Sequence, residues 1–272
     1  MKTIVHVWTQ NVYNLPENHF WGLGDMIRGT YGLYLYAKKN GYNLVVDTSL
    51  HPVSQYLEKP RHIYSELVAE MKDRIYFCMM HDLVPYITGT FTNSDVVVLA
   101  TNCNIEAFSI PAPAELQHLI KTLLTPTPEF DAYCNQFYSQ IPYSPFTILH
   151  VRLGDDELLR GTAIPIGYEA IYECVKRNST PTTILLSDSA SCKKYIQEKG
   201  LAISMFDTKL AHTGVNKDPD AIRDTLMEFL LLTKASSIQS FSIYGWKSGF
   251  VSIAERVYNV PLRCITLNGS SN

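Results

Sequence analysis

The sequence predicts an α/β fold made of two doubly wound lobes that face a cleft. Short apolar runs typical of buried strands alternate with helix-length segments along most of the 272 residues. Alternation of this kind is typical of parallel sheets with right-handed crossovers. A proline-containing stretch that ends near Pro145 divides the alternation into two series. We therefore place the lobes at residues 1–144 and 145–272.

The first series opens with an apolar, β-branched run that reads as a buried strand. A polar loop follows it, and then comes a segment with helical spacing that stops at Gly41. The predicted strands of this lobe are 2–8, 43–47, 74–80 and 95–100, and its predicted helices are 26–41 and 114–124. Prolines in residues 125–145 break the pattern and indicate a connection between the lobes.

The second series repeats the alternation without interruption. Each predicted strand is short and apolar, and each is followed by a segment with helical periodicity. The predicted strands are 146–154, 182–188, 203–207 and 236–242, and the predicted helices are 165–178, 191–200, 220–235 and 249–259.

Composition excludes several classes of protein. The net charge of −3 gives no basic surface of the kind that binds nucleic acid or an anionic membrane. The longest apolar runs are too short to cross a bilayer, and no signal peptide opens the chain. The six cysteines are scattered without a CxxC pair, which favours reduced thiols and argues against zinc. We expect a soluble, cytoplasmic protein with no nucleic-acid partner and no membrane span.

Ionisable and hydroxyl side chains gather where predicted strands end, which is where ligands bind in parallel sheets. The segment ILHVRLGDDE, residues 148–157, places five ionisable groups after an apolar run. Arginine suits a diphosphate, because its planar guanidinium is always charged and grips oxyanions at two points. Serine hydroxyls and backbone N–H groups at a helix start add neutral donors to phosphate. Carboxylates there must orient the arginine, accept from a base or sugar hydroxyl, or move a proton.

The spacing His150-x-Arg152-x-Gly154-Asp155 resembles the HxRxGD motif of the α1,2-, α1,6- and protein O-fucosyltransferase superfamily. Residues 22–47 are similar to that superfamily's glycine-rich loop, helix and strand. Residues 182–196 are similar to its second motif, and residues 228–246 resemble its third. Together these segments cover about half of the chain and follow the order of the superfamily.

The resemblance implies a GT-B-like fold with two Rossmann-like lobes. It also implies inverting transfer of a sugar, usually fucose from GDP-fucose, onto a glycan hydroxyl without an essential metal or other cofactor. In that case Arg152 holds the diphosphate and the Ser240–Ser242 turn contacts it. Asp188 and Glu228 match acidic positions near the nucleoside. Asp224 lies one turn from Glu228 on the same helix face, so either can read the nucleotide.

Three residues depart from the superfamily pattern. Ser189 stands in place of a second aspartate, Glu228 in place of an aspartate, and Leu153 in place of a second arginine. A UDP-linked donor such as UDP-xylose therefore stays open. A non-catalytic protein that binds nucleotide sugars or glycans is a further alternative. An epimerase would need a GxGxxG loop directly after the first strand, and this loop is absent.

An inverting displacement also needs a base, because the acceptor hydroxyl loses its proton as it attacks. Asp25 and Glu157 are the candidates, although Asp25 can equally cap the helix that follows it. His150 is interpreted as a hydrogen-bonding residue that shapes the loop. The candidate catalytic residues are Asp25, Arg152 and Glu157, and the candidate donor-binding residues are Gly22, Gly24, His150, Arg152, Asp155, Ser187, Asp188, Asp224, Glu228, Ser240, Phe241 and Ser242.

Overall fold

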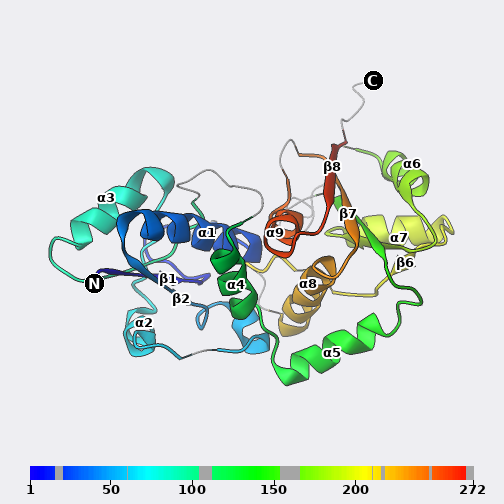
Figure 1. Ribbon diagram of the computed structural model, residues 1–272. Helices are drawn as coiled ribbons and strands as arrows, with labels where there is room; N and C mark the ends of the chain where they lie inside the picture. The colour runs from blue at the N-terminus through cyan, green and yellow to red at the C-terminus, as the bar shows by residue number, and fades with distance from the viewer. Residues whose placement is uncertain are drawn as a thin grey trace. The chain divides into compact units, whose positions relative to one another are not determined.

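The computed structural model describes residues 1–15, 21–59, 61–103, 112–153, 166–209, 211–215, 218–244 and 247–267. The chain forms two compact units (Figure 1). Unit 1 contains Met1–Thr127 and the short segment Thr213–Lys217, and unit 2 contains Pro128–His212 and Asp218–Asn272. The chain therefore returns once to unit 1 before it completes unit 2.

Unit 1 is built on a parallel sheet with the strand order β2-β1-β3. Its core forms between the sheet and helices α1 and α3, where Ile4, Leu33, Ile87 and Val97 are buried together. The strands are β1 (Thr3–Val7), β2 (Asn43–Asp47) and β3 (Val96–Leu99), and the helices are α1 (Leu23–Asn40), the 3-10 helix η1 (Pro52–Tyr56), α2 (Ser65–Met71), α3 (Met80–Thr90) and α4 (Ala114–Leu123).

Two glycines set the position of α1. Gly41 ends the helix in the left-handed conformation, with φ of 67°, as the sequence predicts. Gly29 allows the helix to lie directly against the chain that follows β3. A Cβ atom on Gly29 would stand only 1.9 Å from the backbone oxygen of Thr101.

We expect Gly29→Ala to lower the free energy of unfolding by about 1–3 kcal/mol, because helix and backbone would have to separate. Gly89→Ala in α3 is the matched control, since nothing lies within 4 Å of its Cβ position. Alanine is favoured over glycine in a helix by about 1 kcal/mol, so the control should be neutral or stabilising. Denaturant unfolding of the two variants measures the difference, and equal midpoints would contradict the close approach.

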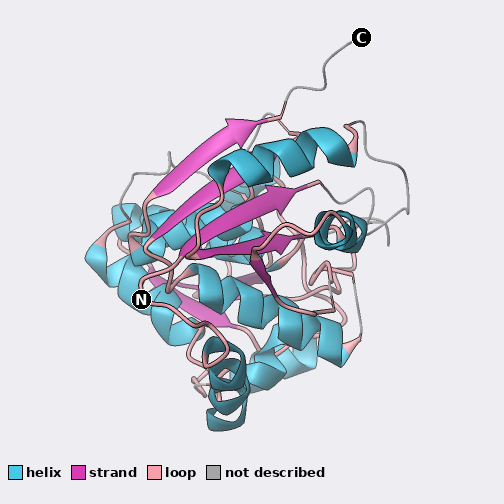
Figure 2. Cartoon of the chain, turned by 90° about the vertical axis from the view of Figure 1, so that its right-hand side faces the viewer, coloured by secondary structure: helices cyan, strands magenta, loops and turns pink. Residues whose placement is uncertain are grey.

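Unit 2 is built on a five-stranded parallel sheet with the order β6-β5-β4-β7-β8, and Figure 2 shows its strands running in the same direction. The strands are β4 (Thr147–Arg152), β5 (Thr183–Ser187), β6 (Ser204–Met205), β7 (Ser237–Ser242) and β8 (Leu262–Thr266), and the helices are α5 (Pro128–Tyr138), α6 (Tyr168–Asn178), α7 (Ala190–Glu198), α8 (Pro219–Leu232) and α9 (Gly249–Tyr258). Successive strands are added on one side of β4 and then on the other. The topological switch point therefore lies between β4 and β7.

Both faces of this sheet are buried, which explains the nearly continuous apolar character of its strands. Ile148 of β4 and Ile184 of β5 pack with residues of α8 and α9 on one face. Their sequence neighbours Leu149 and Leu185 pack with residues of α6 and α7 on the other face. The alternation follows from the period of two along a strand.

The prediction of a strand at residues 74–80 is wrong. That segment contributes a single bridge, between Phe77 and Ala100, and helix α3 begins already at Met80. Helices α2, α3 and α5 and strand β8 are not among the predicted elements. Pro85 lies inside α3 and Pro128 is the first residue of α5, so prolines concealed both helices. Proline is well tolerated at the first helical position, where its missing N–H has no intrahelical partner.

Helix α5 also moves the division between the units. The sequence places the boundary between residues 144 and 145, whereas the compact units divide after Thr127. The physical reason is the packing of α5 on the core of unit 2, where Phe137 meets Phe206 edge to face at 5.6 Å. Within the described residues, no helix has the length and apolar character needed to cross a membrane.

Candidate functional site

The carboxyl ends of β4, β5 and β7 bring several predicted site residues together. The strand register pairs Val151 with Ser187 on one side of β4 and Arg152 with Ser242 on the other. Asp188 follows Ser187 directly. These residues therefore meet at one edge of the sheet, at the switch point where parallel sheets bind ligands.

Arg152 is held at this edge by groups from both neighbouring strands. Its guanidinium lies 3.8 Å from the Asp188 carboxylate, and the same carboxylate accepts a 2.8 Å hydrogen bond from the Leu153 N–H. On the β7 side the guanidinium lies 5.9 Å from the centre of the Tyr244 ring. The Arg152 side chain keeps 21% of its surface exposed, so an anion can reach it. Asp188 thus orients the arginine, a role that sequence reasoning gave to carboxylates at the strand ends.

His150 and Ser240 form a buried pair behind Arg152, with 3.1 Å between Nδ1 and Oγ. Burial, with a smaller contribution from the charge of Arg152, lowers the pKa of His150 to about 3. The ring is therefore neutral near pH 7 and fixes the two strands against each other. Phe241 lies fully in the core. The Ser242 hydroxyl accepts a hydrogen bond from the Tyr244 N–H, which shapes the turn after β7.

Three buried histidines make stability depend on pH. Burial lowers the pKa of His6 to about 4 and those of His51 and His150 to about 3. The unfolded chain takes up protons near pH 6.5 while the folded chain does not, so stability is complete above pH 6.5 and falls below it. We expect a loss of about 1 kcal/mol per pH unit for each histidine between pH 6.5 and 5, because the unfolded imidazole is only half protonated at pH 6.5.

Thermal midpoints measured between pH 7.5 and 5 test this expectation. His51→Asn should remove about one third of the pH dependence, because asparagine can still accept the hydrogen bond from the Val53 N–H at this cap. His118→Gln is the control, since His118 is exposed on α4. A midpoint that does not change from pH 6.5 to 5 would show that the three histidines are not buried in the neutral form.

The two acidic residues of α8 have partners within unit 2. The Glu228 Oε1 atom accepts from Lys193 at 2.9 Å and from Thr208. Asp224 accepts from the Tyr133 hydroxyl, from the Lys209 N–H and from Arg223. Because Thr208 follows β6 and Lys193 lies in the first turn after β5, Glu228 also lies at the carboxyl edge of the sheet.

Lys193 is not among the site residues predicted from the sequence, although its position in a helix is a signal. A cation in the first turn of a helix is unfavourable, because the helix dipole is positive there. Its presence in α7 indicates a carboxylate partner from another element, and Glu228 is that partner. The ion pair is nearly buried, with 12% of the Lys193 side chain and 11% of the Glu228 side chain exposed. Ser189 also has a defined role, because its hydroxyl caps α7 by accepting from the Cys192 N–H.

In unit 1, Asp25 caps α1. One carboxylate oxygen accepts from the Gly22 N–H at 3.2 Å, and the other accepts from Arg28 at 2.7 Å. Arg28 in turn donates to the backbone oxygen of Asn102, which follows β3. Asp25 therefore has the capping role that was its alternative interpretation. It lies beside residues that follow β3, near the carboxyl edge of its own sheet.

The start of α1 has a second partner that the sequence did not indicate. The Leu23 N–H donates to the Thr213 hydroxyl at 2.8 Å, and Gln10 donates to the Thr213 backbone oxygen at 2.6 Å. Thr213 belongs to the segment that returns to unit 1. The N–H groups of Gly22 and Leu23, which the glycine-rich loop would offer to phosphate, thus have protein acceptors. Gly24 is buried within the first turn.

Two predicted residues, Asp155 and Glu157, lie outside the described residues. Among the residues that the structure describes, no group of three or more His, Cys, Asp and Glu side chains could hold a metal ion.

No protein-family model and no curated protein matches the sequence. Solved structures do resemble the chain. The α1,6-fucosyltransferase NodZ of Bradyrhizobium, co-crystallised with GDP, aligns with a TM-score of 0.57 and 16% identity over 100% of this chain and 96% of NodZ. FUT1 of Arabidopsis thaliana in complex with GDP gives 0.59 and 15% over 100% of this chain and 71% of FUT1. The apo form of POFUT1 gives 0.51 and 14% over 97% of each chain.

The chain has the fold of the GT-B fucosyltransferases. The predicted α/β fold class is therefore confirmed. The GT-B fold accounts for the parallel sheets of both units and for the position of the switch point at β4 and β7. The roles of individual side chains are argued from the chemistry of the site.

Proposed function

We propose that this protein is an inverting glycosyltransferase that moves a sugar, with fucose from GDP-fucose as the first candidate, onto a glycan hydroxyl. The observation that carries the proposal is the placement of Arg152 at the switch point, held by Asp188 and faced by Tyr244. The structures of NodZ with GDP and GDP-fucose, and of FUT1 with GDP, support a guanine nucleotide as the leaving group.

The reaction requires a positively charged group beside the departing diphosphate. As the bond between the anomeric carbon and the phosphate oxygen breaks, negative charge grows on that oxygen. In this proposal Arg152 stabilises the charge through two parallel N–H donors, and the Asp188 carboxylate, 3.8 Å away, holds the guanidinium at this edge. The acceptor oxygen attacks the opposite face of the sugar and loses its proton to a base, which inverts the anomeric configuration.

The test of the proposal is a screen of nucleotides and nucleotide sugars by calorimetry, followed by a turnover assay. GDP and GDP-fucose should bind, and the bound GDP-fucose should slowly release GDP with water as the acceptor. Product release should accelerate when the correct glycan is added. Binding of GDP-fucose without any turnover, across a panel of glycans, would identify a non-catalytic binding protein and overturn the proposal.

One observation favours a second donor class. The Glu228 Oε1 atom already accepts from Lys193 and Thr208, so Glu228 has fewer free lone pairs for the two N–H groups on the guanine edge. A UDP-linked sugar such as UDP-xylose asks for a single acceptor at its uracil N–H. In the same screen, tighter binding of UDP than of GDP would replace the guanine donor with a uracil donor.

We further propose that transfer needs no metal ion. Diphosphate leaving groups require a divalent cation or arginine with N–H donors, and Arg152 provides the second arrangement. Treatment with EDTA should therefore leave turnover within about twofold of the untreated rate, and added Mn²⁺ should not raise it by more. Loss of activity with EDTA and its recovery with Mn²⁺ would contradict this expectation.

A further inference from the structure

Unit 2 contains a pocket of about 550 Å³ on the opposite edge of its sheet from Arg152. Phe146 precedes β4 and Lys234 lies shortly before β7, so the pocket opens at the amino ends of these strands. The volume is in the usual range for small-molecule sites. The pocket is lined by Asn135, Tyr138, Ile141, Pro142, Tyr143, Ser144, Phe146, Leu231 and Lys234.

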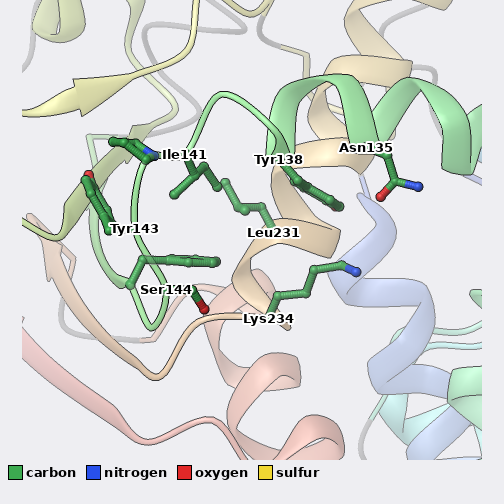
Figure 3. A pocket seen from close by; sticks show the side chains of 9 residues that line it. Asn135, Tyr138, Ile141, Tyr143, Ser144, Leu231 and Lys234 are labelled. Carbon is green, nitrogen blue, oxygen red and sulfur yellow. The ribbon is translucent and has the colours of Figure 1, made fainter.

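The wall of the pocket combines aromatic and aliphatic side chains with polar atoms. Tyr138, Tyr143 and Phe146 line the pocket together with Leu231, which is fully buried. Figure 3 labels Tyr138, Tyr143 and Leu231. The Tyr143 hydroxyl donates to the Thr183 backbone oxygen and pairs with the Ser204 hydroxyl, so Tyr143 offers only its ring to the pocket. Rings fixed in this way suit the flat C–H face of a sugar.

The polar side chains that line the pocket are those of Asn135, Ser144, Lys234 and the two tyrosines. The Lys234 ammonium lies 4.9 Å from the centre of the Tyr138 ring, and Figure 3 shows the two side chains extending alongside each other. Among the described residues Lys234 forms no ion pair, although it is exposed. The Tyr138 hydroxyl is buried beside the Cys134 thiol. Asp131 lies near Tyr138, is exposed and accepts from the Asn135 amide.

We propose that this pocket binds an acidic sugar ring, a uronic acid residue of a glycan, with its carboxylate on Lys234 and its ring against Tyr138 and Phe146. The aromatic rings provide the apolar contact, the ammonium selects a negative group, and the Ser144 hydroxyl is available to a sugar hydroxyl. This site is separate from the donor edge and does not depend on the proposed transfer reaction. The proposal implies that the glycans bound by the protein are acidic.

The test is a titration of the whole protein with digalacturonate and, separately, with the neutral disaccharide digalactose. Binding is measured by NMR from the chemical-shift changes of the sugar. Wild-type protein should bind digalacturonate with a millimolar or lower dissociation constant, at least tenfold more tightly than digalactose. Lys234→Gln should weaken digalacturonate binding by about tenfold and leave digalactose unchanged, since a lost ionic contact of about 1.4 kcal/mol is tenfold in affinity. Tyr138→Phe, which keeps the ring and loses only the buried hydroxyl, should bind digalacturonate as the wild type does.

Lys194→Gln is the matched control, because Lys194 is an exposed lysine of unit 2 that pairs with Glu198 outside the pocket. It should bind digalacturonate as the wild type does. No binding up to about 10 mM, equal binding of both disaccharides, or equal effects of the two lysine substitutions would each overturn the proposal. Release of GDP from GDP-fucose, measured on the same samples, should be the same in Lys234→Gln and wild type. A protein that shows no such release can still pass the binding test, so the two proposals fail separately.

Discussion

Replacing Arg152 with lysine should lower turnover of the nucleotide-sugar donor by about 100-fold or more, in a protein that remains folded. Lysine keeps the positive charge but offers a point charge in place of two parallel donors. It also loses the cation–π contact of the guanidinium with the Tyr244 ring, whose centre lies 5.9 Å away. Steady-state kinetics with GDP-fucose measure the effect, and thermal unfolding confirms the fold.

The alanine variant separates binding from chemistry. Arg152→Ala should weaken the binding of the nucleoside diphosphate by about 2–5 kcal/mol, the range for truncating one partner of a hydrogen-bonded charge pair. Arg177→Ala is the control, because Arg177 is an exposed arginine of α6 in the same unit. Unchanged nucleotide affinity in folded Arg152→Ala would remove Arg152 from the donor site and, with it, the observation that carries the proposed function.

Substitution of the catalytic base should also cause a large loss of turnover. Asp25→Asn and Glu157→Gln each remove a proton acceptor and preserve the shape of the side chain. The variant that lacks the base should lose about two to four orders of magnitude in turnover, with donor binding little changed. The Asp25 side chain is held by the Gly22 N–H and by Arg28, so it is fixed in position but shares its oxygens.

The Asp25 experiment needs a control for capping. Asparagine is also a good N-terminal helix residue, but it cannot form the ion pair with Arg28. Arg28→Gln removes that ion pair and keeps the Asp25 carboxylate, so it should retain turnover if Asp25 is the base. Activity of Asp25→Asn close to wild type at saturating acceptor, together with loss of activity in Glu157→Gln, would assign the base to Glu157. Survival of both variants would leave proton removal to water or to the leaving phosphate.

The strands and helices of unit 2 could be predicted from sequence because each buried strand is an apolar run that ends in polar residues. The register that joins Arg152 to Ser242 follows from parallel pairing, so the convergence of the site residues at one edge was predictable. Strand β8 was not, since Leu262–Thr266 has exposed positions at a sheet edge and lacks a continuous apolar run.

Partners that come from distant parts of the chain were not predictable. The Glu228 carboxylate could be named as a candidate nucleotide reader, but its ion pair with Lys193 depends on how α7 and α8 pack. The Thr213 hydroxyl reaches the start of α1 across 190 positions of sequence, and no local pattern announces it. Helix α5 shows the opposite difficulty, because its signal is local but misleading. Pro128 reads as a helix breaker, although proline is favoured at the first position of a helix.

The Thr213 contact has a consequence for protein engineering. The chain passes between the units after Thr127, after His212 and after Lys217, so neither unit is one uninterrupted stretch of sequence. A chimera made by joining residues 1–127 to a foreign second half would leave the Leu23 N–H and the Gln10 amide without their acceptors. Gly214 packs against the Trp21 backbone, and a Cβ atom at this position would lie 2.4 Å from the Trp21 oxygen. A foreign segment with a larger residue here would clash with Trp21. Recombination of the two units among proteins of this fold must therefore carry the residues around Thr213 with the first unit.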